Sequence, residues 1–315
     1  MNKSLIIARK EFTDAITSKK FWLIIGVFLL FYIASIYMTS FGFRIGGEAP
    51  TRPILQITSN VVSTMAFMAP ILGIALAFDA ISGERERGSL RILLSRPIYR
   101  EDVINGKIIS ALAVIGLTIT ASSLFSVSVS ILLHGISVTL DDIVRICFFI
   151  VLSILFSFAY YSISLFISTF SSKSGHSLTI SLGIWIFFAF ILGILSTVIA
   201  SVILGAPPVT PGSFIVNRTQ GGFNRTERIS ESYLNYSRRE AQITNTIQML
   251  SINYHYSQIA NSLFGSTFSP FGQQATQLSL SGLLTSRWID LLVLIVFPLI
   301  FSVASYAMFT RTQEK

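Results

Sequence analysis

The residue types that carry out chemistry are scattered along this sequence. The three histidines, His134, His176 and His255, stand in separate segments without the spacing of metal ligands. The single cysteine, Cys147, lies inside an apolar run, so we expect a packed small residue and no internal disulfide. No nucleophile, histidine and carboxylate fall into the pattern of a catalytic triad. The sequence therefore predicts neither a catalytic centre nor a metal site.

A glycine-containing stretch has the spacing of a phosphate-binding loop without its chemistry. Gly83 and Gly88 are spaced as in such a loop, but Ser89 stands where the lysine is required and no strand precedes them. The chain does not bind ATP by that route. The adjacent carboxylates Asp141 and Asp142 are explained by the start of a helix, where acidic side chains are stabilised.

The charged segment Phe78–Ser110 is the most informative part of the sequence. Its leucines share one face of a predicted helix and its arginines another: Leu90, Leu93 and Leu94, and Arg87 and Arg91. Pro97 ends this helix, and Asp102 favours the start of the next one. By itself, the pattern fits equally a helix resting in the lipid head-group layer and a contact for a partner protein.

Long apolar runs flank this segment and make up most of the chain. Of the 315 residues, 52% are hydrophobic and 12% are charged, against about 25% charged residues in a typical soluble domain. Six runs are long enough to cross a bilayer, which takes about 20 residues. They are Phe21–Phe43, Ile54–Phe78, Val103–Leu133, Ile146–Ser172, Ser177–Gly205 and Leu291–Thr310. Because the runs lack the alternation of a barrel, the predicted class is an all-α membrane protein.

Basic residues predict how these spans are oriented. Lysine and arginine gather before the first run and between the second and third, whereas the adjoining short loops hold few. The positive-inside rule therefore places both chain ends and the segment 79–103 in the cytoplasm. The first run lacks a cleavage site, so we interpret it as a retained signal-anchor. Orientation signals and anionic lipid explain the net charge of +8 better than nucleic acid does.

The predicted organisation has a large outer loop before the last span. It comprises an amphipathic helix in 1–20, spans one to five in 21–205, the outer loop in 206–287, the sixth span in 288–310 and a cytoplasmic tail in 311–315. Prolines after the fifth span end that helix, and Ile229–Leu263 has the pattern of one or two amphipathic helices. Three sequons, at Asn217, Asn224 and Asn235, predict N-glycosylation on the extracellular side.

The predicted spans lack charge at mid-depth and are rich in hydroxyl groups. Asp79, Arg145, His176 and Asp290 lie at span ends, where interfacial anchoring or helix capping explains them. An ion-coupled carrier is therefore disfavoured. Two hydroxyl stripes occur, namely Thr118, Ser122, Ser126 and Ser130, and Ser153, Ser157, Ser164 and Ser168. Close packing of helices is favoured for them over a polar path for a substrate.

The segment Phe78–Ser110 resembles the signature of ABC-2-type transporter permeases. The matching residues are Glu84, Glu86, Gly88, Ser89, Leu90, Leu93, Leu94, Pro97, Arg100, Gly106 and Lys107. Ser89 and Tyr99 replace a commoner Thr and Ser. The first twenty or so residues resemble the family's amphipathic entry segment. The six spans with a long outer loop before the last resemble the nitrous-oxide-reductase-maturation and gliding-motility branch.

The resemblance implies a subunit driven by a partner. Such permeases pair as dimers, with a second copy or a related chain, and bind two copies of a separate ATPase subunit. That subunit would hold ATP and magnesium, and this chain would hold no cofactor. The coupling helix would comprise Glu84, Glu86, Arg87, Gly88, Leu90, Arg91, Leu93, Leu94 and Pro97, with its leucines as the buried anchor. Ser172 and Lys173 would form a smaller second contact.

The predicted function is therefore that of the permease subunit of an ATP-driven exporter in the cell membrane. The alternative is a membrane-anchored receptor or scaffold whose outer loop binds a ligand. A passive anchor needs no structured cytoplasmic helix, which disfavours this alternative. An intramembrane enzyme would need polar catalytic groups at depth.

Overall fold

The structure, a computed structural model, describes residues 3–46, 53–89, 99–134, 138–208, 213–219, 222–228, 231–264 and 279–311. The chain forms two compact units. The first consists of residues 1–185 together with 255–315, and the second of residues 186–254.

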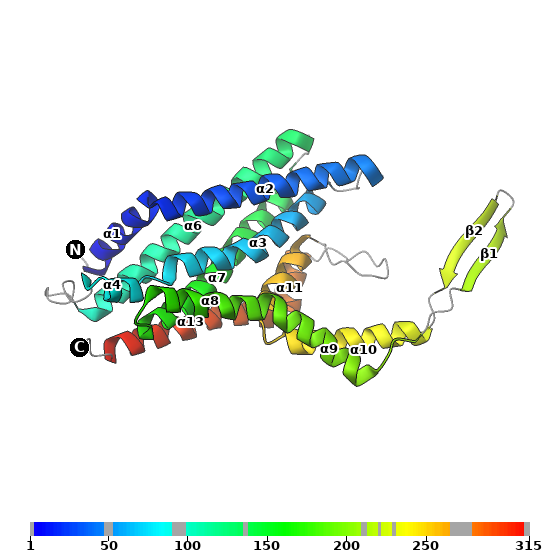
Figure 1. The fold of residues 1–315 in the computed structure, drawn as a ribbon. Coiled ribbons are helices and arrows are strands. Elements are labelled where there is room, and N and C mark those ends of the chain that lie inside the picture. Colours follow the sequence, from blue (N-terminus) through cyan, green and yellow to red (C-terminus); the bar gives the residue numbers. More distant parts are fainter. Residues whose placement is uncertain are drawn as a thin grey trace. The chain divides into compact units, whose positions relative to one another are not determined.

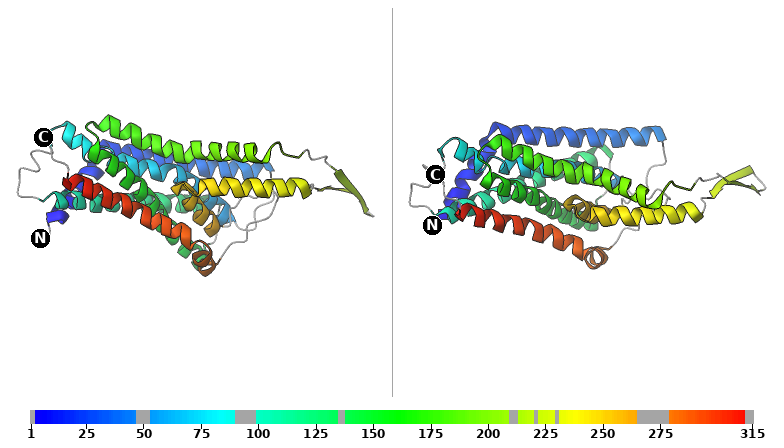
Figure 2. Two further views of the ribbon diagram at one scale, coloured as in Figure 1. Left: turned by 90° about the horizontal axis from the view of Figure 1, so that it is seen from below. Right: turned by 60° about the horizontal axis from the view of Figure 1, so that its bottom comes forward.

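The first unit is a bundle of helices (Figure 1). Its elements are α1 (Lys3–Thr17), α2 (Lys19–Gly46), α3 (Pro53–Ala77), α4 (Ser82–Glu86), α6 (Arg100–His134), α7 (Leu140–Phe170), α12 (Leu280–Ser286) and α13 (Trp288–Arg311), with most of α8 (Ser174–Ile186) and α11 (Ile252–Phe264). Helix α1 begins and α13 ends at the same end of this bundle, where α4 also lies (Figures 1 and 2).

Six helices in the described chain are long and apolar enough to cross a membrane, which confirms the predicted class. The candidate spans are Lys19–Tyr37, Val61–Glu86, Arg100–Leu133, Leu140–Phe170, Ser174–Leu204 and Trp288–Arg311. Each overlaps one of the six predicted runs. The ends differ from the predicted ones, some lying beyond the apolar run and others, such as Tyr37 and Val61, inside it.

Helix α7 forms the centre of the bundle, in contact with α3, α6 and α13. A Cβ atom on Gly73 would lie 2.2 Å from the backbone oxygen of Ser157, so this approach of α3 to α7 requires glycine. The Ser157 hydroxyl donates to the Ala69 carbonyl across the same contact at 2.8 Å. All eight residues of the two predicted hydroxyl stripes are buried. Their burial and this bond support the packing role predicted for them.

The start of α7 shows why two carboxylates stand there. Thr139 and Asp142 form a capping box, in which each side chain bonds the other residue's backbone N–H. The predicted helix start is therefore observed.

The packed position expected for Cys147 is wrong, because this side chain is exposed on the surface of the chain. The sequence gives the apolar surroundings of Cys147 but not the face of the helix on which it lies.

The second unit contains the π-helical turn η1 (Phe187–Ile191), α9 (Leu192–Leu204), the strands β1 (Ser213–Thr219) and β2 (Gly222–Arg228), and α10 (Glu231–Gln248). Gly205 has a φ of +75° and ends α9 ahead of the prolines. The Tyr236 hydroxyl donates to the Gly205 carbonyl at 2.9 Å and joins α10 to the end of α9. Helices α10 and α11 are the amphipathic helices predicted within Ile229–Leu263. The hairpin of β1 and β2 was not predicted, and it pairs Asn217 with Asn224.

Candidate functional site

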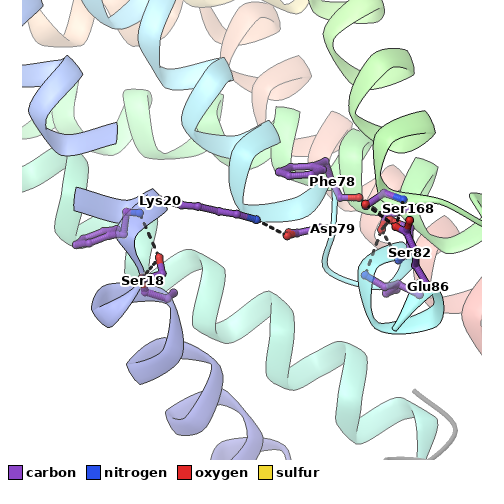
Figure 3. Close-up of polar contacts among 11 residues, drawn as sticks. Ser18, Lys20, Phe78, Asp79, Ser82, Glu86 and Ser168 are labelled. Atoms are coloured by element: carbon purple, nitrogen blue, oxygen red, sulfur yellow. Dashed lines mark hydrogen bonds and ion pairs between the residues drawn. The ribbon is translucent and has the colours of Figure 1, made fainter. Parts of the chain in front are cut away.

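A dense polar cluster surrounds α4, the short helix that follows α3. The Ser168 hydroxyl of α7 accepts hydrogen bonds from the backbone N–H groups of Ile81 at 3.1 Å and Ser82 at 3.0 Å (Figure 3). The first N–H groups of a helix have no partner within it, so Ser168 acts as their cap. The start of α4 is thereby fixed to α7.

Arg85 fixes the middle of α4 to the end of the same long helix. Its guanidinium donates to the carbonyl oxygens of Ser171 at 2.8 Å and Thr169 at 3.0 Å. The last carbonyls of a helix lack partners within it and carry a partial negative charge. A cation is therefore well placed to satisfy them.

Glu86 fixes the end of α4 to the beginning of α8. Its carboxylate accepts hydrogen bonds from the Ser174 backbone N–H at 3.0 Å and from the Ser174 hydroxyl at 2.7 Å. Ser174 is the first residue of α8, where the free N–H groups favour a negative charge. Figure 3 shows Glu86 on the short helix beside Ser82 and Ser168.

Glu84 takes part in a buried group of three charges. The Lys107 ammonium of α6 lies 2.7 Å from a Glu84 carboxylate oxygen and 3.2 Å from one of Glu11 in α1. The Lys107 side chain is only 4% exposed. A buried ammonium is stable only when carboxylates pair with it, because leaving water is costly for an isolated charge. Lys107 thus joins α1, α4 and α6 at one point.

Helix α1 lies directly against α6 beside this ion group. A Cβ atom on Gly106 would lie 2.7 Å from the Ile7 side chain and 3.1 Å from the Ser4 carbonyl oxygen. The Ser4 hydroxyl donates to the Asp102 carboxylate at 2.6 Å. The glycine therefore lets α1 come close enough for Glu11 to reach Lys107.

The turn between α1 and α2 is tied to the end of α3. The Ser18 hydroxyl accepts from the Phe21 backbone N–H at 3.2 Å and caps α2. The adjacent Lys20 ammonium lies 2.6 Å from the Asp79 carboxylate, as Figure 3 shows. Asp79 was predicted to be an interfacial anchor or cap, and in the structure it pairs with this lysine.

The predicted coupling residues fall partly within the described chain. Glu84, Glu86, Arg87 and Gly88 are described, whereas Leu90, Arg91, Leu93, Leu94 and Pro97 lie outside the described residues. Arg87 and Gly88 are exposed, and so are Ser172 and Lys173 of the predicted second contact. The bond between Glu86 and Ser174 places the two predicted contact regions side by side. Their role in binding an ATPase subunit stays a prediction.

Sequence reasoning missed the internal bonds of this cluster. It assigned Glu84 and Glu86 to a partner's surface, whereas both carboxylates bind groups of the same chain. Arg85 counted only as one of the basic residues between the second and third apolar runs, which predict the orientation of the spans. The signature could have indicated these bonds. Its first part, at Glu84, and its last part, at Gly106 and Lys107, lie next to each other in the fold.

A second polar group lies at the other end of the bundle, where α11 meets α7 and α13 (Figure 1). The Tyr256 ring stacks on Phe156 with ring centroids 4.2 Å apart, and its hydroxyl lies 3.0 Å from the Ser153 hydroxyl. Burial raises the pKa of the Tyr256 phenol, so it stays neutral. His255 bonds the Asp290 carboxylate through Nδ1.

Arg145 and Asp290 were expected to lie at span ends as interfacial anchors or caps; they stand near the starts of α7 and α13, but both side chains are buried. Arg145 is 5% exposed and Asp290 is 9% exposed. Arg145 lies 2.7 Å from the Asp141 carboxylate and donates to the Leu263 carbonyl of α11 at 2.7 Å. Both charges therefore hold α11 against the bundle. Among the described residues, no three His, Cys, Asp or Glu side chains lie close enough together to hold a metal ion.

Comparison with known proteins identifies a family that matches nearly the whole chain. The family model described as "ABC-2 family transporter protein" matches residues 5–313. A probable ABC transporter permease protein NosY from Pseudomonas aeruginosa is 30% identical over 226 residues, which cover 68% of this chain and 77% of the relative. A probable ABC transporter permease protein NosY from Stutzerimonas stutzeri is 24% identical over 224 residues, covering 70% of this chain and 79% of that protein.

Proposed function

Given that the chain belongs to the ABC-2 family of transporter proteins, we propose that it couples ATP hydrolysis by a separate subunit to the export of a substrate across the cell membrane. In this proposal the chain is the permease, and it pairs with a second permease and with two ATPase subunits. Its two ends and α4 face the cytoplasm.

The observation that carries this proposal is that hydrogen bonds attach α4 to three other helices. Glu84 bonds α6, Arg85 bonds the end of α7, and Glu86 bonds the start of α8. A force applied next to α4 reaches three candidate spans through bonded groups. A passive anchor has no need of such a junction, so the receptor or scaffold alternative gains no support from it.

The internal bonds divide the predicted coupling residues into two groups. Glu84 and Glu86 connect α4 to its own chain and transmit movement. Arg87, which is exposed, and the adjoining segment through Pro97 supply the surface for the ATPase subunit. The apolar leucines of that segment would provide the buried part of the contact. The exposed Ser172 and Lys173 would add the smaller second contact.

Charge reversal tests this assignment. The variant Arg87→Glu with Arg91→Glu should lose the ATPase subunit during copurification and should lose transport, because the charge complementarity of the contact is inverted. Arg9→Glu with Lys3→Glu is a matched control, since both residues are exposed cations of α1. If the Arg87 and Arg91 variant copurified with the subunit and transported normally, the coupling assignment would be wrong.

A further inference from the structure

Helix α11 fills a space inside the bundle although it is too short to cross a bilayer. It has 13 residues and therefore a length of about 20 Å, against about 30 Å for a hydrocarbon core. From Tyr256 onward its buried apolar side chains are Tyr256, Ile259, Ala260, Leu263 and Phe264. Helix α11 is thus an insert among the spans and is not itself a span.

Polar side-chain contacts attach this insert to two spans. His255 bonds the Asp290 carboxylate of α13, and the Leu263 carbonyl accepts from Arg145 of α7 at 2.7 Å. The Tyr256 hydroxyl lies 3.0 Å from the Ser153 hydroxyl of α7. Each of these contacts can be broken without unfolding a helix.

The Tyr256 hydroxyl lies in a layer of hydroxyl groups that come from four helices. The Tyr32 phenol of α2 interacts electrostatically with the Tyr256 phenol and lies next to the Ser123 hydroxyl of α6, outside hydrogen-bonding geometry. At a rise of 1.5 Å per residue, Tyr32 stands about 20 Å from the start of α2, and Ser153 stands about 25 Å from the end of α7. The layer is therefore close to the middle of the spans.

Three hydroxyl groups at this layer are buried without a hydrogen bond in the described part of the chain. They belong to Tyr32, Ser123 and Ser126, which is one turn further along α6. Three other hydroxyl groups of α6 donate to the carbonyl four residues earlier, namely those of Thr118, Ser122 and Ser130. Native proteins rarely leave buried polar groups unpaired. A second arrangement of the bundle, in which water reaches these three groups, accounts for their polarity.

We propose that α11 is a plug that closes a hydroxyl-lined passage between α2, α6 and α7. When α11 moves away from these spans, water enters from the end of the bundle remote from α4 and hydrates Tyr32, Ser123 and Ser126 (Figure 1). Hydroxyl groups are neutral donors and acceptors, so the passage suits uncharged polar solutes better than ions. This inference rests on the proposed function, since transport is what requires the passage to open.

The accessibility of an introduced thiol provides the first test. Ser126→Cys is made in a Cys147→Ser background, and the complex with the ATPase subunit is placed in nanodiscs and treated with 2-sulfonatoethyl methanethiosulfonate. This reagent attacks a hydrated, ionised thiol, so position 126 should react at least about tenfold faster during ATP hydrolysis than without nucleotide. Ser164→Cys is the matched control, because Ser164 is equally buried and bonds Ser181 at 2.9 Å. Position 164 should stay unreactive in both conditions.

Shortening the plug provides the second test. Tyr256→Ala removes the ring that stacks on Phe156 and should raise the reaction rate at position 126 at least about tenfold even without nucleotide. Tyr256→Phe keeps the ring and should leave the rate unchanged. Asp290→Asn weakens the attachment of α11 through His255 and should raise the rate in the same direction. This variant keeps the test decisive if Tyr256→Ala does not fold, which thermal unfolding shows.

The two tests separate the plug from the proposed function. A rate raised by Tyr256→Ala but not by ATP supports the plug and contradicts the coupling to ATP hydrolysis. Rapid reaction at position 126 in the parent without nucleotide would show that no plug closes the passage. A rate at position 126 that stays as low as that at position 164 in every folded variant would show that α11 closes nothing. Either of these last two results overturns the plug, and so does an equal rise at position 164, which would indicate general loosening of the bundle.

Discussion

Glu84 and Lys107 form an ion pair of 2.7 Å between α4 and α6, and Glu11 of α1 shares the same ammonium at 3.2 Å. Twenty-three residues separate Glu84 from Lys107 in the sequence. Three helices that reach this point from different directions are thus held by one nearly inaccessible cation. The stability of the junction should depend on the balance of these charges.

Removing the cation alone should destabilise the protein. Lys107→Met leaves the carboxylates of Glu11 and Glu84 close together without a cation and should lower the free energy of unfolding by about 3 kcal/mol. Neutralising all three residues, with Glu11→Gln and Glu84→Gln added, should recover most of that loss. Thermal and denaturant unfolding of purified protein measure both effects. A Lys107→Met variant as stable as the parent would show that the charges are not coupled.

Gly73→Ala should disrupt the contact of α3 with α7. The new Cβ would lie 2.2 Å from the Ser157 oxygen, and because this is a backbone atom the two helices must separate. We expect a loss of about 2 kcal/mol, typical of overpacked cores. Gly26→Ala is the control, since nothing beyond its chain neighbours and the backbone of its own helix lies within 4 Å of its Cβ position. Comparable stability of the two variants, measured by unfolding in detergent, would be evidence against the close approach.

The hydrogen bond between Tyr256 and Ser153 should contribute modestly to the docking of α11. A double-mutant cycle of Tyr256→Phe and Ser153→Ala should give a coupling energy of about 0.6 kcal/mol, the average for hydrogen bonds between membrane helices. The phenylalanine keeps the stacking on Phe156, so the cycle isolates the hydroxyl. Strictly additive effects of the two substitutions would mean that the hydroxyls do not interact.

A short cross-link between α4 and α8 should be compatible with transport. Glu86→Cys with Ser174→Cys, in a Cys147→Ser background, joins the two residues that the structure already bonds. If α4 and the start of α8 move as one body, joining them leaves the transport cycle intact. Transport assays on vesicles with and without a reductant measure this. Reversible loss of transport on cross-linking would show that α4 separates from α8 during the cycle.

The six spans could be predicted because each needs a long uncharged run, and few other structures tolerate one. The capping role near Asp142 was equally local, since a capping box depends on residues three positions apart. The signature around Glu84 indicated the family, which the comparisons then confirmed. These predictions rest on neighbouring residues.

The internal bonds of the cluster could not be predicted in the same way. The charges of Glu84, Arg85 and Glu86 look in the sequence like a solvated surface, and only the fold brings their partners from α6, α7 and α8. The burial of Arg145 and Asp290 could not be predicted either. The sequence shows where each residue stands along its helix but not which side of the helix faces the bundle. The hairpin of β1 and β2 was missed because the two paired strands carry no local apolar pattern that would predict them.

The bond of Glu86 to the first residue of α8 also constrains how this chain can change in length. One residue inserted between Ser171 and Ser174 would turn α8 by about 100° and carry Ser174 away from the carboxylate. Insertions and deletions at this turn should therefore be rare among functional relatives, even though Ser172 and Lys173 are exposed. An exposed connection is here held to a fixed length by a single carboxylate.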